Sequence, residues 1–584
     1  MCGIWALIRD INAAFAISEA DAEQLIMNTL ENRGPEGGRV VTLIDQIILG
    51  FTRLAINGLT SDGMQPFHHN GIWTVCNGEI YNYKAIAEKH GFKLKTGSDC
   101  EVLPLLYEKF ADSQEDLWNS LDGVFAAIIV DTNRRRVIVA RDPYGVRPLF
   151  YGTFNCGSRY KVYEQLVFGS EMKSINSLGP DKIQQFPPGH YINYDIDTMD
   201  SVSFIKYHKY SDNFNSDVEE AKSIPAPIVY EQYTSFIKDP REFDNISNEI
   251  KDDGEAMFMI RAKLEEAVHK RMLTERPVAA LLSGGIDSSL IAALVARELR
   301  AAGAPPLKTF SIGFEGSEDL KYARMVADHI GSDHNEIVMT PDDFFAAIPE
   351  VIKDIESFDT TTVRASVGNW LVAREIRRRT DCKVVFNGDG SDEVFGSYMY
   401  FYKAPSDAEF DAESIRLLKD ICYYDVLRSD RSISSHGLEP RTPFLDKGFV
   451  ATAHKVSSSI RRPIIGERPE KWILRAAFAD RDLLPDAVLW RKKEAFSDGV
   501  SGPDKLWYQN IQERLGSVLV DEITSATYEH MMPSSDEDYY YRYLFEKTYT
   551  GRGTVIPYRW MPRWIEDATD PSARTLQVYA ATSQ

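Results

Sequence analysis

The stretch VAALLSGGIDSSLIAALVARELR (278–300) decides the fold of the second half of this chain. Its first five residues are apolar, which predicts a buried strand over 278–282. Two glycines then permit a tight turn, and apolar residues at helical spacing predict a helix that begins at about Asp287. Strand, glycine turn and helix in this order are typical of an α/β fold, and they place the turn at a helix N-terminus.

The same alternation continues on both sides of this stretch. KTFSIGF (308–314) and NEIVM (335–339) indicate strands, and LKYARMVADHI (320–330) indicates a helix between them. An amphipathic helix precedes the first strand, with apolar residues at helical spacing at Met257, Ile260, Leu264, Ala267 and Val268. We therefore expect a doubly wound α/β domain with a parallel sheet and helical additions towards the C-terminus.

The first 200 residues have a different pattern. Short runs rich in β-branched and aromatic residues are separated by Gly, Asn, Asp and Pro, which predicts layered antiparallel sheets. The clearest of these runs are WTVCNGEIYN (73–82), VFAAIIVD (124–131), RRRVIVARD (134–142) and PLFYG (148–152). Residues 208–255 are acidic and polar and contain SIPAP, which indicates a partly mobile linker or surface insertion. The expected domains are therefore 2–207 and 256–584, joined by 208–255.

Bulk composition limits the classes of function. At 584 residues the chain exceeds what one hydrophobic core usually supports. The formal net charge of −21 argues against nonspecific binding to nucleic acid or to an anionic membrane. No apolar run approaches the ~18 residues of a spanning helix, and the start lacks the basic region of a signal peptide. The six cysteines form no CxxC pair and no zinc spacing, so we expect free thiols and a cytosolic location.

The glycine turn SGGIDSS has the composition of a phosphate site. Backbone N–H groups and the hydroxyls of Ser283, Ser288 and Ser289 converge at a helix N-terminus, where anions are favoured. An ordinary capping turn would account for Asp287 and one serine, but it does not require two glycines beside three hydroxyls. Asp287 would repel a bare phosphate, so we expect it to act through Mg²⁺. The chain contains no Gly-Lys dipeptide, so this is not a Walker loop.

A second glycine-rich turn, VVFNGDGSDEVFG (384–396), follows another short strand. Three acids within 389–393 repel one another unless a cation or hydrogen-bond donors neutralise them. In an open parallel sheet this turn lies at the carboxyl edge, beside the first one. An acidic calcium-binding turn is the alternative, but the ligand spacing of an EF-hand is missing. We expect a role with nucleotide and Mg²⁺.

The chain begins MCGI, with a cysteine directly behind the initiator methionine. Removal of that methionine would leave a free α-amine and a thiol on Cys2, a nucleophile with its own adjacent base. The alternative is a buried thiol in a first β-strand.

Two sets of motifs carry a family resemblance. The first resembles a class II, N-terminal-nucleophile glutamine amidotransferase domain and consists of MCGI, ENRGPE (31–36), TRL (52–54), NGEIYN (77–82) and TGSDCE (96–101). The second resembles the ATP-pyrophosphatase-type synthetase domain of glutamine-dependent asparagine synthetase, eukaryotic type. It consists of LLSGGIDSS (281–289), TTVRAS (361–366), NGDGSDE (387–393), EPRTPFLD (439–446), EKWILR (470–475) and KKEAFSDG (492–499). The match runs nearly end to end.

The resemblance implies a fold and roles for the first domain, a layered αββα N-terminal-nucleophile hydrolase. Cys2 attacks glutamine, and the Asn77 side chain and the Gly78 N–H stabilise the oxyanion. The implied glutamine-binding residues are Arg53, Ile56, Asn77, Glu79 and Asp99. Ammonia released at Cys2 then reaches the second domain through an internal passage.

For the second domain the resemblance implies activation of aspartate as β-aspartyl-AMP, with ATP and Mg²⁺ as cofactors. The implied ATP-binding residues are Leu281, Ser283, Gly284, Gly285, Asp287, Ser288, Ser289, Ile312, Asn387 and Gly388. Thr361, Thr362 and Arg364 are implied on the aspartate side, and Asp389 and Lys471 in catalysis. Asp287 and Asp392 are the implied Mg²⁺ ligands. The family also implies a homodimer acting on small molecules.

The chain departs from the family pattern at four positions, Asn32, Glu36, Asn387 and Asp389. Each change keeps polarity, so we expect retuned rates rather than lost activity. A β-lactam-synthetase-like cyclase is one alternative, but such relatives typically lack the N-terminal cysteine. A silent regulatory paralogue is the other, and the intact Cys2, Ser283, Asp287, Asp392 and Lys471 argue against it.

Overall fold

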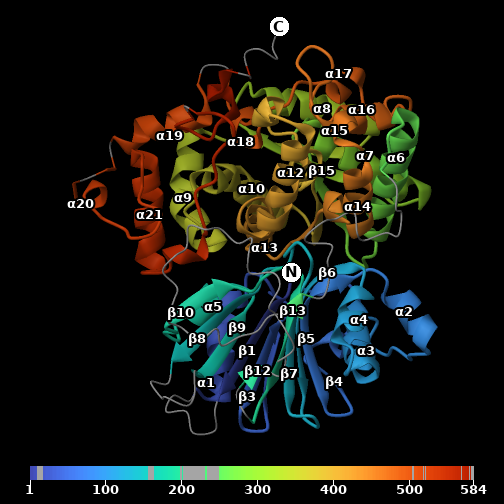
Figure 1. The fold of residues 1–584 in the computed structure, drawn as a ribbon, viewed down its shortest axis with the longest axis vertical. Helices are drawn as coiled ribbons and strands as arrows, with labels where there is room; N and C mark the ends of the chain where they lie inside the picture. Colours follow the sequence, from blue (N-terminus) through green and yellow to red (C-terminus); the bar gives the residue numbers. More distant parts are fainter. Residues whose placement is uncertain are drawn as a thin grey trace. The chain divides into compact units, whose positions relative to one another are not determined.

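The computed structural model describes residues 1–9, 17–155, 163–197, 200–201, 231–232, 249–502, 505–516, 518–519, 521–566, 568–577 and 579. The chain divides into two compact units (Figure 1). The first contains Cys2–Arg53 and Thr60–Thr234, and the second contains Met1, Leu54–Leu59 and Ser235–Gln584. Most of the expected linker 208–255 lies outside the described residues, so its structure stays a prediction.

The first unit is built on two antiparallel sheets. One has the strand order β10-β8-β9-β1-β3-β2, and the other has the order β12-β11-β7-β6-β5-β4, with β13 also paired to β11. The strands of the first sheet are β1 Gly3–Arg9, β2 Gly38–Leu43, β3 Ile47–Thr52, β8 Phe150–Asn155, β9 Tyr163–Gly169 and β10 Lys182–Gln185. Those of the second are β4 Phe67–His69, β5 Ile72–Ile80, β6 Gly123–Asp131, β7 Arg136–Arg141, β11 His190–Asp195, β12 Asp200–Ser201 and β13 Glu231–Gln232.

The core of this unit lies between the two sheets. Alternate residues of β1, such as Ile4 and Ile8, pack in one apolar cluster with Val75 of β5 and Ile128 of β6. Every residue of β6 is buried, because one face meets this core and the other is covered. Helices α1 (Glu19–Leu30) and α5 (Lys173–Asn176) pack on the first sheet, and α3 (Val102–Phe110) packs on the second. Helices α2 (Tyr83–His90) and α4 (Gln114–Asn119) lie against α3. The expected αββα layering is confirmed.

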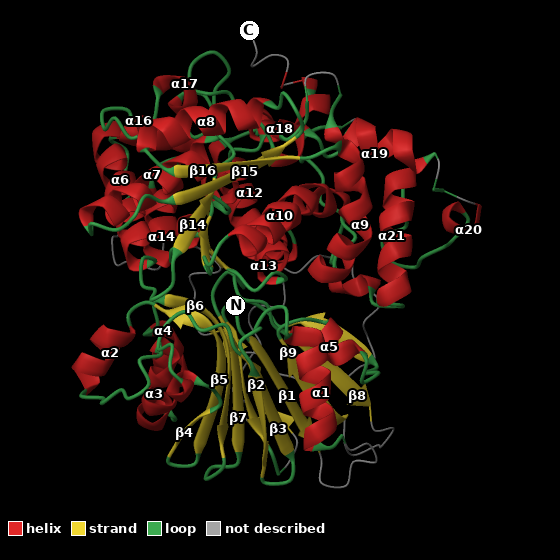
Figure 2. Ribbon diagram, turned by 180° about the vertical axis from the view of Figure 1, so that it is seen from behind, coloured by secondary structure: helices red, strands yellow, loops and turns green. Residues whose placement is uncertain are grey.

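The second unit holds a five-stranded, entirely parallel sheet of order β16-β15-β14-β17-β18, shown in yellow among helices in Figure 2. Its strands are β14 Val278–Leu281, β15 Lys308–Gly313, β16 Asp333–Val338, β17 Val384–Phe386 and β18 Glu439–Arg441. The chain runs outward from β14 through β15 to β16, then returns to the other side of β14 as β17. A ligand crevice is expected at the carboxyl ends of β14 and β17, where the direction of winding reverses.

Helices surround this sheet. Those that precede β18 are α6 Asp253–Lys270, α7 Ile286–Ala301, α8 Glu318–Ile330, α9 Pro341–Ile355, α10 Thr360–Arg379, α11 Ser391–Phe395, α12 Asp407–Asp420 and α13 Asp425–Ser434. The later ones are α14 Lys447–Lys455, α15 Ser458–Arg461, α16 Trp472–Phe478, α17 Asp486–Leu489, α18 Phe496–Gly499, α19 Trp507–Leu515, α20 Asp521–Thr524 and α21 Asp536–Thr548. Within the described ranges, no helix has both the length and the apolar character needed to cross a bilayer.

The predicted strand and helix pattern of this unit is confirmed within a few residues. Helix α7 begins at Ile286, one residue before the predicted start. The amphipathic helix before β14 is α6, which buries Ile260, Leu264 and Ala267 as its periodicity requires.

Candidate active sites of the two units

Contacts of serine hydroxyls fix the conformation of the loop between β14 and α7. The backbone N–H of Ser283 donates to Ser288 Oγ at 3.1 Å, and the two serine Oγ atoms lie 2.9 Å apart. Gly284 adopts a φ of 73°, and a Cβ there would come within 2.5 Å of Tyr322 Cβ. Glycine is therefore required, and both serine hydroxyls are fixed beside the N-terminus of α7.

The two glycine-rich loops lie against each other, as predicted from their strand ends. A Cβ on Gly388 would come within 2.7 Å of both Asp287 Cβ and the Ser288 backbone nitrogen. Ser391 Oγ also donates to Asp287 Oδ1 at 2.8 Å. The close backbone approach brings the carboxylates of both loops to one edge of the sheet.

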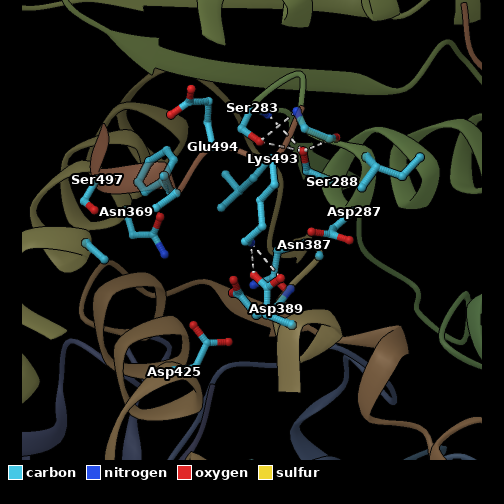
Figure 3. A pocket seen from close by; sticks show the side chains of 18 of the residues that line it. Ser283, Asp287, Ser288, Asn369, Asn387, Asp389, Asp425, Lys493, Glu494 and Ser497 are labelled. Carbon is cyan, nitrogen blue, oxygen red and sulfur yellow. Dashed lines mark hydrogen bonds and ion pairs between the residues drawn. The ribbon is translucent and has the colours of Figure 1, made fainter. Parts of the chain in front are cut away.

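Two lysines neutralise these carboxylates. Lys471 Nζ lies 2.5 Å from Asp287 Oδ2 and 2.7 Å from Asp392 Oδ1. Lys493 Nζ lies 2.7 Å and 2.6 Å from the two carboxylate oxygens of Asp392. We name these four residues the charge quartet. Figure 3 shows the Lys493 side chain crossing the pocket, with its ammonium on the side of Asn387 and Asp389.

The quartet shifts the pKa values of its buried members. Burial alone would lower the pKa of Lys471, but Asp287 and Asp392 outweigh burial and raise that pKa. Burial alone would raise the pKa of Asp392, yet Lys471 and Lys493 hold that pKa far below its usual value. Both groups are therefore charged at neutral pH. Lys471 also adopts a left-handed backbone (φ 57°, ψ 26°), a costly conformation for a residue with a side chain.

A second charged cluster borders the same cavity. Arg428 Nη2 donates to Asp389 Oδ1 at 2.8 Å and also contacts Asp425. Burial raises the pKa of Asp389, although Arg428 acts in the opposite direction. Asn387 donates through its side-chain amide to Ser429 Oγ at 2.7 Å, so this departure from the family pattern has a satisfied partner.

These groups line one cavity of about 230 Å³. Leu281 lines it from the end of β14, Ser283 and Gly285 from the first loop, Ser288 from the start of α7, and Ile312 from β15. Thr361 and Thr362 line it from α10, Asn387, Gly388 and Asp389 from the second loop, and Asp392 from α11. Ser289 is completely buried, and its hydroxyl has no hydrogen-bond partner in the described structure. Gly284 shapes the loop without lining the cavity.

The structure places Arg364 elsewhere. Its guanidinium forms paired contacts with Glu537, at 2.8 Å and 2.6 Å, and with Asp570, at 2.8 Å for each. It does not line the cavity. Its implied aspartate-binding role stays a prediction, since the guanidinium would have to leave these carboxylates to meet a substrate.

In the first unit, the residues around Cys2 are tightly packed. Cys2 is half-buried beside the core, and its carbonyl oxygen accepts from Arg33 Nε at 3.1 Å. Arg33 is fully buried and pairs with Glu171 at 2.8 Å. A Cβ on Gly34 would come within 2.3 Å of the Thr52 backbone, so this loop packs directly on the end of β3. The family departures Asn32 and Glu36 flank this packing and are exposed.

Asn77 has an unusual environment on β5. Its side chain is completely buried, and neither its amide nitrogen nor its carbonyl oxygen has a hydrogen-bond partner in the described structure. A Cβ on the following Gly78 would come within 2.3 Å of the Val124 carbonyl oxygen. A buried amide without partners is costly, so its presence calls for an explanation, and a ligand group that supplies the missing bond is one.

The implied glutamine-binding side chains are buried, and all except Ile56 belong to the first unit. Asp99 Oδ2 accepts from the Ile80 backbone N–H at 2.7 Å, and Glu79 is buried. Arg53 Nη1 donates to the Thr60 carbonyl at 2.7 Å. Ile56 belongs to the segment Leu54–Leu59, which clusters with the second unit. The glutamine-binding roles of these residues stay predictions.

Comparisons with known proteins match both units. The model of the asparagine synthase family matches residues 259–409 and 404–566, and that of the glutamine amidotransferase domain family matches residues 1–185. The glutamine-hydrolyzing asparagine synthetase of Gallus gallus is 40% identical over 598 residues, covering 100% of each chain. This chain belongs to the glutamine-hydrolysing asparagine synthetase family. The Mus musculus enzyme is 38% identical over 601 residues and covers 100% of each chain, and the Homo sapiens enzyme is 38% identical over 596 residues and covers 99% of each.

Several residues at the cavity of this asparagine synthetase family member were not predicted from the sequence, among them Lys493, Asp425 and Arg428. Lys493 lies within the KKEAFSDG motif, which could have drawn attention to it. Asp425 and Arg428 begin helix α13 and follow no glycine turn, so no local signal pointed to them.

Proposed function

We propose that this chain makes L-asparagine from L-aspartate and L-glutamine in a reaction that cleaves ATP. Family membership supports this reaction, and one structural observation carries the synthetase half. One cavity at the carboxyl edge of the parallel sheet brings the serine-rich loop together with the charge quartet of Asp287, Asp392, Lys471 and Lys493. Such a set suits a polyphosphate bound with a divalent cation.

The glutaminase half begins at Cys2, once removal of Met1 has freed its α-amine. The α-amine takes the thiol proton, and the thiolate attacks the carboxamide carbon of glutamine. The proton passes from the amine to the departing nitrogen as the carbon–nitrogen bond breaks, so ammonia is released and a thioester remains, which water hydrolyses to glutamate. The unpartnered Asn77 amide offers its N–H to the oxyanion of the tetrahedral state. Because that amide is already buried, it needs no reorganisation when the charge develops.

The synthetase half activates a poor electrophile. The β-carboxylate of aspartate attacks the α-phosphorus of ATP, and pyrophosphate leaves. The lone pair of ammonia then attacks the acyl carbon of β-aspartyl-AMP, and AMP leaves. Ser283, Ser288 and the N-terminus of α7 would face the phosphates, and Lys471 would balance their charge. We further propose that the ammonia passes from Cys2 to this cavity within the protein.

The charge quartet fits a divalent cation. One ammonium already lies within 2.7 Å of oxygens from both Asp287 and Asp392, so a single cation can reach both carboxylates. Among the described residues, no group of three His, Cys, Asp or Glu side chains could hold a metal ion. Mg²⁺ commonly takes one or two carboxylates and completes its shell with substrate phosphates and water. Asp287 and Asp392 would hold it, and it would polarise the phosphoryl oxygens.

Product identification tests the proposal. Purified protein is incubated with aspartate, glutamine, ATP and Mg²⁺, and we expect asparagine, glutamate, AMP and pyrophosphate in equal amounts. ADP and phosphate formed in step with asparagine would contradict adenylation. An intramolecular cyclisation product that forms without ammonia would favour the cyclase, and the absence of any turnover would favour a regulatory paralogue. Omitting glutamine and adding ammonium should leave the same nucleotide products. A dilute sample analysed by light scattering tests the expected homodimer.

A further inference from the structure

Lys493 has a position that the proposed reaction does not yet use. Its ammonium donates to both carboxylate oxygens of Asp392, at 2.7 Å and 2.6 Å, while Lys471 bridges Asp392 and Asp287. The Lys493 side chain is 11% exposed and that of Lys471 is 1% exposed. Two ammonium groups therefore occupy the carboxylate oxygens that a divalent cation would need.

The charges of the quartet balance without a ligand. Two carboxylates and two ammonium groups sum to zero, so the quartet itself contributes no net attraction for a metal ion. A divalent cation that enters alone must displace ammonium groups from Asp287 and Asp392, and breaking these buried ion pairs is strongly unfavourable. A nucleotide that enters alone faces the same problem, because its phosphates compete with the carboxylates for both lysines. Only the two ligands together supply each displaced group with a new partner.

The two lysines differ in freedom. Lys471 is almost completely buried, and its ammonium is held between Asp287 and Asp392. Lys493 lies on the segment between α17 and α18, and its backbone N–H is anchored to Glu470 Oε1 at 3.1 Å. Its four-carbon side chain runs along the cavity, with the Tyr398 ring centre 5.5 Å from its ammonium. The backbone can thus stay fixed while the ammonium moves, which suits an exchange of partners.

We propose that Lys493 holds Asp392 in place of the metal and passes to the nucleotide phosphates when metal and nucleotide bind together. Lys493 is then both a counterion of the empty site and a phosphate-binding residue, and it couples the two ligands. This inference rests on the proposed ATP-dependent function. It adds that metal binding without nucleotide is suppressed by this one side chain.

The test measures ligand binding rather than turnover. The full chain is titrated with Mn²⁺ in the absence of nucleotide, and free Mn²⁺ is followed by electron paramagnetic resonance. Lys493→Met leaves Asp392 with Lys471 alone, so we expect Mn²⁺ to bind at least tenfold more tightly than to the wild type. In a parallel titration with ATP and Mg²⁺ but without aspartate, the same variant should bind nucleotide at least tenfold more weakly. Opposite shifts in the two affinities would not follow from a merely structural role.

Two further variants keep the test decisive. Lys493→Arg retains the charge, so Mn²⁺ binding should stay close to the wild-type level and nucleotide binding should be partly restored. Lys403→Met removes an exposed lysine of η6 (Met399–Lys403), which does not line the cavity, and should change neither affinity. Unchanged or weaker Mn²⁺ binding in folded Lys493→Met, or Mn²⁺ binding in Lys493→Arg as tight as in Lys493→Met, would overturn the proposal. The failure of adenylation itself is seen separately, as the absence of AMP in the product assay.

Discussion

The two candidate sites of this protein differ in how their buried polar groups are paired. In the first unit, the Asn77 amide is buried with both of its polar atoms unpartnered. In the second, the charged groups of the quartet are already paired with one another. An uncharged amide without partners costs about 1–3 kcal/mol, which a fold can tolerate. A buried charge without a partner costs far more, so the second site must keep counterions until its ligands arrive.

This difference predicts how separable the two activities are, and the largest effect is expected at Cys2. Cys2→Ala should abolish asparagine synthesis with glutamine, because the nucleophilic sulfur is lost. Ammonium-driven synthesis should stay within about twofold, because the quartet is untouched. Steady-state rates with each nitrogen donor measure the split. Equal loss with both donors in a folded protein would contradict independent sites.

Asp392→Asn should give the reverse pattern. It removes one charge from the quartet and leaves Lys471 and Lys493 competing for fewer carboxylate oxygens. We expect aspartate-dependent pyrophosphate release to fall by roughly a thousandfold, about 4 kcal/mol. Glutaminase activity at Cys2 should persist. Wild-type rates of pyrophosphate release from this variant would remove Asp392 from the site.

Asn77→Ala tests the contrast between the unpartnered amide of the first unit and the paired charges of the second. Loss of one oxyanion donor should reduce the glutaminase kcat by roughly 100- to 1,000-fold. Because the wild-type amide has no partner, the thermal midpoint should not fall and could rise by a few degrees. Differential scanning fluorimetry and glutamine hydrolysis measure both. A clear loss of stability with full activity would indicate a structural amide instead.

Arg53→Lys tests recognition of glutamine as an amino acid. A guanidinium grips a carboxylate through two parallel hydrogen bonds, which an ammonium cannot reproduce. If Arg53 holds the α-carboxylate, the KM for glutamine should rise by about ten- to a hundredfold, or roughly 1.5–3 kcal/mol. Ammonium-driven rates provide the internal control. An unchanged KM would indicate a structural role for Arg53, to which its contact with Thr60 contributes.

The smallest effect is expected at His334, away from both sites. Burial, with Arg324 adding to it, lowers the pKa of His334 to about 4, and the ring hydrogen-bonds Thr309 and Ser311 at 2.9 Å and 3.1 Å. The folded pKa is below the ordinary 6.5, so the neutral ring stabilises the fold above pH 6.5, and this contribution is lost as the pH falls towards 4. Between pH 7 and 5.5 the loss should be about 1 kcal/mol, reduced by partial exposure. Urea unfolding of the wild type and of His334→Gln at both pH values measures it, and an identical pH dependence of the two would exclude His334.

The sequence by itself determined the fold class of both units, and it predicted which residues take part in catalysis. Strands 278–282 and 384–386 and the helix from Asp287 follow from apolar spacing and glycine, because these features act between near neighbours in the chain. The position of the two glycine loops at one edge also followed, since parallel strands end on the same side of a sheet. The catalytic assignments of Cys2, Asn77 and Lys471 came from motif resemblance.

Only the tertiary structure decided which charges meet. Lys493 and Asp392 are 101 residues apart, and Arg364 meets Glu537 across 173 residues. Any of many acids could have paired with either cation, because an ion pair depends on distance in space and on burial rather than on spacing along the chain. The same holds for the missing partners of Asn77, which became visible only once every neighbouring donor and acceptor had a position.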